Sequence, residues 1–307
     1  MLDRRGEAVP SGDDLDHGAR AASRHGLEGL AARVEGPASW DDLIVPDRAR
    51  RALETIAAFL RHRDRVVSDW GYERIAGATP GMTILFAGES GTGKSIAATV
   101  VARDLGLELF RIDLATVVSK FIGETEKQLE RVFDAAAGSN AILLFDEADA
   151  LFGKRSEVQD AHDRYANIEV AYLLQRIEAY DGAVILTSNL RHNIDQAFLR
   201  RLDLVVEFPF PEEDDRARLW RRLVPAGAPT VEIDVAFLAE RFRLSGGSIR
   251  NASLTAALIA AGEGGTITMA HLARAIALEY DKLGRLTLES DFGPLYGAIR
   301  PSVAARR

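Results

Sequence analysis

The chain has 307 residues, enough for one large domain or two smaller ones that each bury a hydrophobic core. It carries 38 Lys and Arg against 46 Asp and Glu, a formal net charge of -8. This acidic balance argues against a protein that coats the phosphates of duplex nucleic acid. Cysteine is absent, which excludes disulfides and thiolate metal sites and makes a cytoplasmic location the expectation. No apolar run approaches the roughly 18 residues that a membrane span needs, so no membrane partner is expected.

The first 39 residues contain many Gly, Ala and charged residues and few aliphatic ones. This composition predicts a flexible N-terminal arm over 1–39. The pattern changes at Trp40, where "WDDLIV" precedes Pro46 and apolar residues then recur at helical spacing as far as Leu60. A globular domain is therefore expected to begin at residue 40.

Five apolar runs of strand length follow, namely "MTILFA", "LELFRIDL", "AILLFDEA", "GAVILTSN" and "LDLVVEFPFP". Strands that are apolar on both faces and alternate with helices indicate a parallel sheet covered on both sides. Residues 40–211 are therefore predicted to form a doubly wound α/β domain. From Glu212 the strand signal fades and amphipathic helices succeed one another, which predicts a small all-α domain over 212–284 and a C-terminal tail over 285–307.

The segment "GESGTGKS", directly after the first of these strands, fits the pattern G-x-x-x-x-G-K-[ST]. Its glycines let the backbone wrap a triphosphate with the N–H groups directed inward, Lys94 neutralises the β- and γ-phosphates, and Ser95 binds Mg²⁺. An ordinary flexible turn is disfavoured by the strand-loop-helix setting. The predicted nucleotide-binding residues of this phosphate loop are Gly88, Ser90, Gly91, Thr92, Gly93, Lys94, Ser95 and Ile96.

Two acidic residues, Asp146 and Glu147, end the apolar strand in "AILLFDEADALF". Carboxylates at such a strand end face the crevice where ligands bind, so Asp146 is predicted to organise the metal and its waters. Glu147 is predicted to polarise an attacking water as the general base. Asn189 ends the next predicted strand, where it either orients the same water or serves as a simple turn residue.

The order of the phosphate loop, "FDEAD", "TSN" and "IDQAFLRRLD" resembles that of the AAA+ ATPases. The wording is similar to the subgroup that includes protein-unfolding and remodelling machines, in a bacterial single-module form. The resemblance extends from about Trp40 to about Leu283 and favours the water-orienting role for Asn189. It implies ATP and Mg²⁺ as cofactors, and a homo-oligomeric ring, expected to be a hexamer, as the assembly.

The resemblance also implies that Arg200 and Arg201 are arginine fingers, which reach from one subunit to the γ-phosphate bound by its neighbour. A guanidinium group suits this role because it keeps its charge and matches phosphate oxygens bidentately. Many relatives place a "PG" turn between two such arginines, which "LRRLDLVVEF" lacks. Which of the two residues acts is therefore left open.

A basic-aromatic loop follows the second strand and contains Lys120, Phe121, Ile122 and Gly123. It is similar to the pore loop with which substrate-threading members of the family grip a polypeptide, whereas the alternative is that Phe121 covers a local core. The polar stretch 153–170 is either a second pore-facing loop, with Lys154, Arg155 and His162 as contacts, or a solvated loop.

In the helical region "LSGGSIRNASLTAA" is similar to the lid segment that covers the nucleotide base. Gly246 and Gly247 are expected to allow close approach of the backbone to adenine and ribose, and Arg250 is a candidate phosphate sensor. An apolar shelf for the adenine is expected from Leu43, Ile44 and Val45.

The leading hypothesis is a Mg²⁺-dependent ring ATPase that remodels, unfolds or disassembles a protein substrate, with an adaptor or the client supplying specificity. One alternative is a nucleic-acid motor or loader, which the acidic balance and the aromatic loop disfavour. Another is an assembly factor of a contractile injection system or phage-tail-like particle. A scaffold that binds ATP without hydrolysing it is disfavoured because it would need neither Glu147, Asn189 nor the arginine pair.

Overall fold

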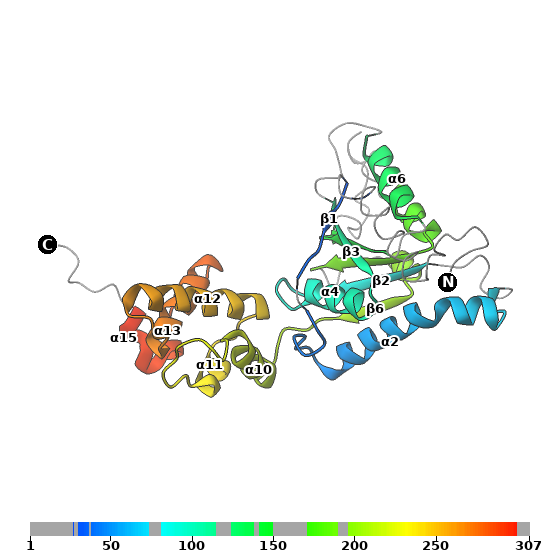
Figure 1. The fold of residues 1–307 in the computed structure, drawn as a ribbon. Coiled ribbons are helices and arrows are strands. Elements are labelled where there is room, and N and C mark those ends of the chain that lie inside the picture. The colour runs from blue at the N-terminus through cyan, green and yellow to red at the C-terminus, as the bar shows by residue number, and fades with distance from the viewer. Residues whose placement is uncertain are drawn as a thin grey trace, which may run out of the picture. The chain divides into compact units, whose positions relative to one another are not determined.

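The structure is a computed structural model that describes residues 27, 30–36, 38–73, 81–114, 124–137, 141–149, 171–189 and 196–299. The chain divides into two compact units (Figure 1). The first contains the described residues up to Leu43 together with Asp47–Glu89 and Lys94–Phe208, and the second contains Ile44–Pro46, Ser90–Gly93 and the described residues from Pro209 onward. The crest of the phosphate loop is thus grouped with the second unit.

The first unit is built on a sheet that holds six strands within the described residues, in the order β1-β3-β4-β5-β2-β6. Strands β2 to β6 run parallel, and β1 pairs antiparallel with β3. All five strands predicted from the apolar runs are confirmed. The strand bounds are β1 (Ala32–Arg33), β2 (Met82–Ala87), β3 (Glu108–Asp113), β4 (Ala141–Asp146), β5 (Ala183–Ser188) and β6 (Leu204–Glu207).

The strand β1 lies inside the segment predicted as a flexible arm. Its pairing continues through the Val34 N–H, which donates to the Leu109 carbonyl at 2.8 Å, and Arg33 forms an ion pair with Glu108. Leu27 is completely buried in the first unit's core. Residues 32–34 are therefore held on the edge of the sheet, where they cover backbone groups of β3 that would otherwise stay unpaired.

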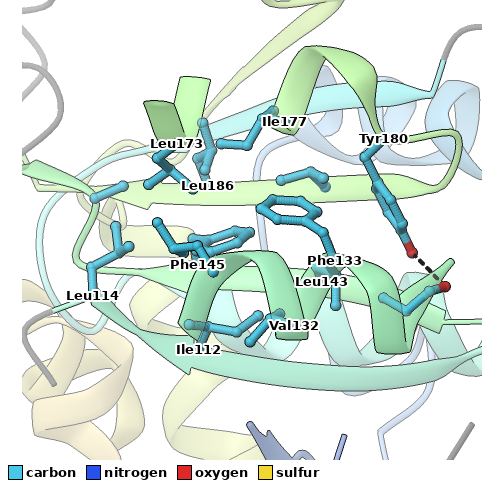
Figure 2. Packing of buried hydrophobic residues seen from close by; sticks show 14 of the residues in the cluster. Ile112, Leu114, Val132, Phe133, Leu143, Phe145, Leu173, Ile177, Tyr180 and Leu186 are labelled. Carbon is cyan, nitrogen blue, oxygen red and sulfur yellow. Dashed lines mark hydrogen bonds between the residues drawn. The ribbon is translucent and has the colours of Figure 1, made fainter. Parts of the chain in front are cut away.

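One face of the sheet is covered by α6 (Glu124–Ala136) and by a helix over 171–179. Phe133 of α6 stacks on Phe145 of β4, with ring centroids 5.9 Å apart. It also meets Tyr180 edge-on at 5.6 Å, and the Tyr180 hydroxyl donates to the Ala136 carbonyl. Figure 2 shows how this cluster gathers side chains from both helices and the strands, among them Ile112, Leu114, Val132, Leu143, Leu173, Ile177 and Leu186.

The opposite face is covered by α2 (Asp47–Asp64), which continues as the π-helix η1 (Arg65–Asp69), and by α4 (Lys94–Asp104). Helix α4 contacts β3, β4 and β5, and α2 packs against α4 and β6. Alternate strand residues point to opposite faces, so the buried residues between the cluster members face this side. They include Ile84, Phe86, Ile142, Leu144 and Ile185. A parallel sheet with helices on both faces confirms the doubly wound α/β fold.

The second unit is helical among its described residues and has its own core. Trp220, Phe242 and Phe292 are completely buried in it, and the rings of Phe242 and Phe292 lie 4.9 Å apart. Phe292 belongs to the segment predicted as a tail, so the described residues 285–299 pack as part of this unit. Its helices are α10 (Glu213–Leu223), α11 (Val235–Arg241), α12 (Gly246–Glu263), α13 (Met269–Lys282), α14 (Glu289–Phe292), the 3-10 helix η2 (Gly293–Leu295) and α15 (Tyr296–Ile299). The short α9 (Gln196–Leu199) belongs to the first unit.

Candidate nucleotide site

Three neighbouring parallel strands end side by side at one edge of the sheet. Strands β2 and β5 pair in register as far as Ala87 and Ser188, and β5 also pairs with β4. The residues at the strand ends, Gly88, Asn189 and Asp146, are therefore neighbours. In doubly wound sheets, ligands bind beyond the carboxyl ends of the strands where the strand order reverses. Here that reversal lies at β2, because the next three strands, β3 to β5, lie on one side of it and β6 lies on the other.

The loop between β2 and α4 has a backbone that requires glycine. Gly91 has φ of 77° and Gly93 has φ of 107°, values that side-chain-bearing residues rarely adopt. Gly88 is buried, and a Cβ atom there would lie 2.2 Å from the carbonyl oxygen of Phe208. The glycines predicted from the motif are thus demanded by the loop's shape and by its close approach to the segment after β6.

Lys94 begins α4, and its side chain is 8% exposed. Its ammonium group donates to the carbonyl oxygens of Gly88 (2.5 Å) and Glu89 (3.0 Å) and to Asn189 Oδ1 (2.9 Å), which engages all three of its donors. Burial lowers the pKa of Lys94, and the carboxylates of Asp146, Asp149 and Glu89 oppose that shift. The structure therefore fixes a cation at the base of the loop, next to the predicted water-orienting amide.

Asp146 and Glu147 are held by a hydroxyl group from the neighbouring strand. Thr187, which is 1% exposed, donates through Oγ1 to Asp146 Oδ1 at 2.5 Å and accepts the backbone N–H of Glu147 at 3.1 Å. Glu147 has φ of 54°, a left-handed conformation that is strained for a residue with a side chain. Its side chain is exposed. Such strain at a strand end is characteristic of functional positions, and it accords with the predicted general base.

Asn189 is fixed by a second acidic residue that the sequence interpretation did not assign. Asp149 Oδ1 accepts the Ser188 hydroxyl and the Asn189 backbone N–H, the latter at 3.0 Å. Asp149 Oδ2 faces Asn189 Nδ2 at 3.4 Å. Thr187 and Asp149 are therefore site residues that sequence reasoning missed, and Ser188 contacts Asp149 from the buried end of β5. The available signals were the two hydroxyl residues in "TSN" and the final acid of "FDEAD".

The second unit brings together three of the predicted glycines. The Gly247 N–H donates to the Gly91 carbonyl at 3.0 Å. A Cβ atom on Gly91 would lie 2.6 Å from Ser245 Oγ, and one on Gly247 would lie 3.1 Å from Gly91 Cα. Ser245 caps α12 by accepting the Ser248 N–H, which fixes the start of this helix at Gly246 and Gly247. Gly247 thus approaches the Gly91 backbone closely within the second unit, whereas the expected approach of these glycines to adenine and ribose stays a prediction.

The remaining predicted residues are placed as follows. Leu43 and Val45 are buried and Ile44 is half-buried, while Ser95, Ile96 and Arg250 are exposed. Arg200 and Arg201 lie exposed in the turn after α9. Among the described residues, neither arginine makes a hydrogen bond or ion pair with the phosphate loop, and Arg201 pairs instead with Glu178 at 3.2 Å.

Two predicted loops lie outside the described residues. They are the pore loop with Lys120, Phe121, Ile122 and Gly123, and the polar stretch that contains Lys154, Arg155 and His162.

The donors and acceptors at the strand ends fit a nucleoside triphosphate with Mg²⁺. The site combines the buried Lys94 ammonium, the N-terminus of the 11-residue helix α4 and the exposed Ser95 hydroxyl with the half-buried Asp146 carboxylate. Backbone N–H groups at a helix N-terminus bind phosphate, and hydroxyl and carboxylate oxygens suit Mg²⁺. Bound Mg²⁺ would neutralise part of the phosphate charge. Fold and site together define a P-loop nucleotide-binding protein.

The family described as "ATPase family associated with various cellular activities (AAA)" matches residues 84–210. The chain is 32% identical over 253 residues to "ATP-dependent zinc metalloprotease FtsH 3" of Sphaerobacter thermophilus, covering 79% of this chain and 50% of that protein. It is 29% identical over 217 residues to spastin of Anopheles gambiae, covering 67% and 25% respectively. It is 32% identical over 157 residues to the proteasome-activating nucleotidase of Methanococcus vannielii, covering 49% and 38%.

The chain therefore contains an AAA ATPase domain over residues 84–210, and this match supports ATPase activity. The predicted AAA ATPase domain and the α/β fold are confirmed, whereas the subgroup stays a prediction. The chain spans about half or less of the length of these curated relatives. No helix among the described residues is long and apolar enough to cross a membrane.

Proposed function

We propose that this protein hydrolyses ATP with Mg²⁺ and couples hydrolysis to the remodelling, unfolding or disassembly of a protein substrate within a ring of identical subunits. The observation that carries the proposal is the convergence of Lys94, Asp146, Glu147 and Asn189 at the ends of adjacent strands, since a protein that only binds ATP needs no strained, water-facing glutamate.

Each residue has one task in this proposal. Lys94 binds the β- and γ-phosphates, exchanging some of its present oxygen partners for phosphate oxygens. Ser95 and Asp146 hold the Mg²⁺. Glu147 accepts a proton from the attacking water, and Asn189 orients that water beside the γ-phosphate.

Arg200 is the better candidate for the arginine finger. Arg201 is engaged with Glu178, whereas Arg200 is exposed and has no ion-pair partner among the described residues. A finger must be free to leave its own subunit and meet a phosphate elsewhere, and a guanidinium already paired to a carboxylate gives up that contact first. We therefore assign the larger catalytic role to Arg200.

A protein substrate is supported by the names of relatives, which include a metalloprotease, a proteasome-activating nucleotidase and a proteasome regulatory subunit. It is also supported by the acidic net charge of -8, which disfavours a nucleic-acid track. The aromatic loop at Phe121 is the proposed grip on the polypeptide.

A substrate trap tests the proposal. Glu147→Gln keeps the shape of the site but removes the base, so the purified protein should bind ATP, release almost no phosphate and retain a protein client. Lys94→Ala serves as the matched control, because it should neither bind ATP nor retain the client. The proposal fails if wild-type protein releases no phosphate from Mg-ATP with or without clients. It also fails in its protein-directed part if duplex or single-stranded nucleic acid, and no protein, stimulates turnover in a salt-sensitive manner.

Mixing two inactive variants tests action in trans. A Lys94→Ala subunit cannot bind ATP but still carries Arg200, whereas an Arg200→Ala subunit binds ATP but lacks the finger. Their mixture should recover turnover that neither variant has alone. When Arg201→Ala replaces Arg200→Ala, mixing should raise turnover less above that of the separate variants. No recovery at any mixing ratio would contradict a shared site between subunits.

Phe121→Ala tests the grip. It should leave basal ATP turnover near the wild-type rate while client processing is lost. Phe59→Ala, which removes an aromatic ring that is 43% exposed on α2, is the matched control and should affect neither activity. Normal client processing by Phe121→Ala would exclude Phe121 as the grip.

A further inference from the structure

Asp149 has no catalytic task in the proposal above, yet its carboxylate accepts three hydrogen bonds from Ser188 and Asn189 at the end of β5. One of its oxygens, Oδ1, accepts both the Ser188 hydroxyl and the Asn189 backbone N–H. The other, Oδ2, faces the Asn189 side-chain amide nitrogen at 3.4 Å. Ser188 is 1% exposed, so the carboxylate is attached to a buried strand end and to the first residue beyond it.

The amide of Asn189 lies between a cation and an anion. Its oxygen accepts from the Lys94 ammonium at 2.9 Å, and its nitrogen faces the Asp149 carboxylate. An ammonium group can only donate hydrogen bonds, and a carboxylate can only accept them. A flipped amide would place donor against donor at Lys94 and acceptor against acceptor at Asp149. The two charged neighbours therefore permit one orientation of the amide.

We propose that Asp149 is a positioning residue that acts through Asn189. It fixes the strand end by its backbone and hydroxyl contacts and holds the amide in the orientation that Lys94 also requires. One hydrogen of Asn189 Nδ2 is directed to Asp149, which leaves the other for the attacking water or the γ-phosphate. The inference rests on the proposed ATP hydrolysis and adds a residue that sets the geometry of its water-orienting group.

Asp149 differs from Glu147 in the surroundings of its carboxylate. Glu147 is exposed and carries its side chain from a strained backbone. Asp149 is half-buried, and three donors from Ser188 and Asn189 meet its two oxygens. A carboxylate offers about four lone-pair sites, so most of its accepting capacity is used within the protein. This geometry suits orientation of a neighbour and leaves proton transfer to Glu147.

The decisive variant is Asp149→Asn. Its carbonyl oxygen can still accept the Ser188 hydroxyl and the Asn189 backbone N–H, so the strand end stays attached. Its amide nitrogen, however, would face Asn189 Nδ2 as donor against donor, and the Asn189 amide could then satisfy either its new neighbour or Lys94 but not both. We expect kcat to fall by roughly 10- to 100-fold, the loss typical when an outer-shell partner that orients a metal ligand is removed. The KM for ATP should stay within about threefold of wild type.

Two comparisons separate positioning from a merely structural role. Ser188→Ala removes one contact to Asp149 Oδ1 and leaves the amide contact intact, so its kcat should stay within about threefold of wild type. Asn189→Ala should lose about as much as Asp149→Asn, and the double variant should lose no more than Asn189→Ala alone, because Asp149 acts only through Asn189. Losses that multiply in the double variant, or a wild-type kcat in Asp149→Asn, would overturn the inference.

A spectroscopic measurement gives a result that is independent of turnover. The ¹⁵N-edited spectrum of the full chain contains the Asn189 side-chain amide, assigned by its loss in Asn189→Ala. Its two protons should be inequivalent in wild type, move in Asp149→Asn and stay in place in Ser188→Ala. Absence of ATP hydrolysis by the wild-type protein would refute the proposed function. The position of the Asn189 amide resonance would still show whether Asp149 holds the amide. An unchanged resonance in Asp149→Asn would refute the positioning role by itself.

Discussion

Replacing Thr187 with Val tests how the hydrolytic site is held together. Valine has nearly the same shape but lacks the hydroxyl that donates to Asp146 and accepts the Glu147 N–H. A hydrogen bond to a charged group contributes about 1.5–3 kcal/mol, and a neutral one about 1 kcal/mol. Since Thr187 is 1% exposed, water cannot easily replace either bond. We therefore expect Thr187→Val to lower the free energy of unfolding of the first unit by about 2–4 kcal/mol.

The catalytic loss should be larger than the loss of stability suggests. Glu147 occupies a strained backbone conformation, with φ of 54°, and its N–H bond to Thr187 helps to keep it there. Without that bond the glutamate relaxes, and a displacement of about 1 Å can reduce a rate by on the order of 10²-fold. The expected result is a large fall in kcat with little change in nucleotide affinity, measured by phosphate release and by equilibrium binding of ADP.

Thr99→Val is the matched control for this experiment. Thr99 is 8% exposed in the same unit, and its hydroxyl donates to the Ser95 carbonyl one helical turn earlier. That bond is neutral and local, so its loss should cost less than about 1 kcal/mol and leave kcat unchanged. The reasoning would be refuted if Thr187→Val matched this control in both urea unfolding and turnover.

Three further predictions concern the two units separately. Lys94→Ala should abolish ATP binding, measured by fluorescent-nucleotide titration, and binding at wild-type strength would contradict the phosphate-loop assignment. Phe292→Ala should lower the free energy of unfolding of the second unit by about 3–5 kcal/mol, because it empties a fully buried site, and denaturant melts that overlay wild type would disprove this. The Glu263 pKa is lowered by its hydrogen bonds to Arg274 and His271. The ionised Glu263 carboxylate therefore stabilises the folded protein above the ordinary carboxyl pKa. This stabilisation is lost as the pH falls through the pKa of Glu263 in the folded protein. Glu263→Gln should accordingly lower the melting temperature near pH 7, and this difference from wild type should shrink as the pH falls below the ordinary carboxyl pKa. A difference independent of pH would exclude the linkage.

Much of the fold was predictable because its signals are local. The parallel strands are short apolar runs, and the phosphate loop is a contiguous motif whose glycines also have to meet backbone constraints, as at Gly91 and Gly93. The strand β1 was not predictable in this way. It consists of Ala32 and Arg33 alone, and its pairing depends on the exposed edge of β3, which no local pattern reveals. Phe292 was missed for the same reason, since it follows a non-periodic stretch and is buried only by residues such as Phe242 and Tyr280.

The candidate site divides along the same line. The local motifs are enough to identify Lys94, Asp146 and Glu147. The contacts of Asp149 and Thr187 depend instead on the pairing of β4 with β5, which brings together residues about 40 positions apart. The distinction between Arg200 and Arg201 likewise depends on Glu178, a residue on another helix. Groups that perform chemistry are thus easier to recognise in a sequence than the groups that orient them.

The strand β1 has a practical consequence for any shortened version of the protein. A protein trimmed to the most recognisable part, residues 84–210, or even begun at Trp40, would lose both β1 and the buried Leu27. Such a protein would expose the unpaired backbone groups of β3 to solvent and would have a cavity in its hydrophobic core. An unpaired edge strand can pair with other chains and cause aggregation. Preparations meant for biochemistry should therefore retain the residues from Leu27 onward.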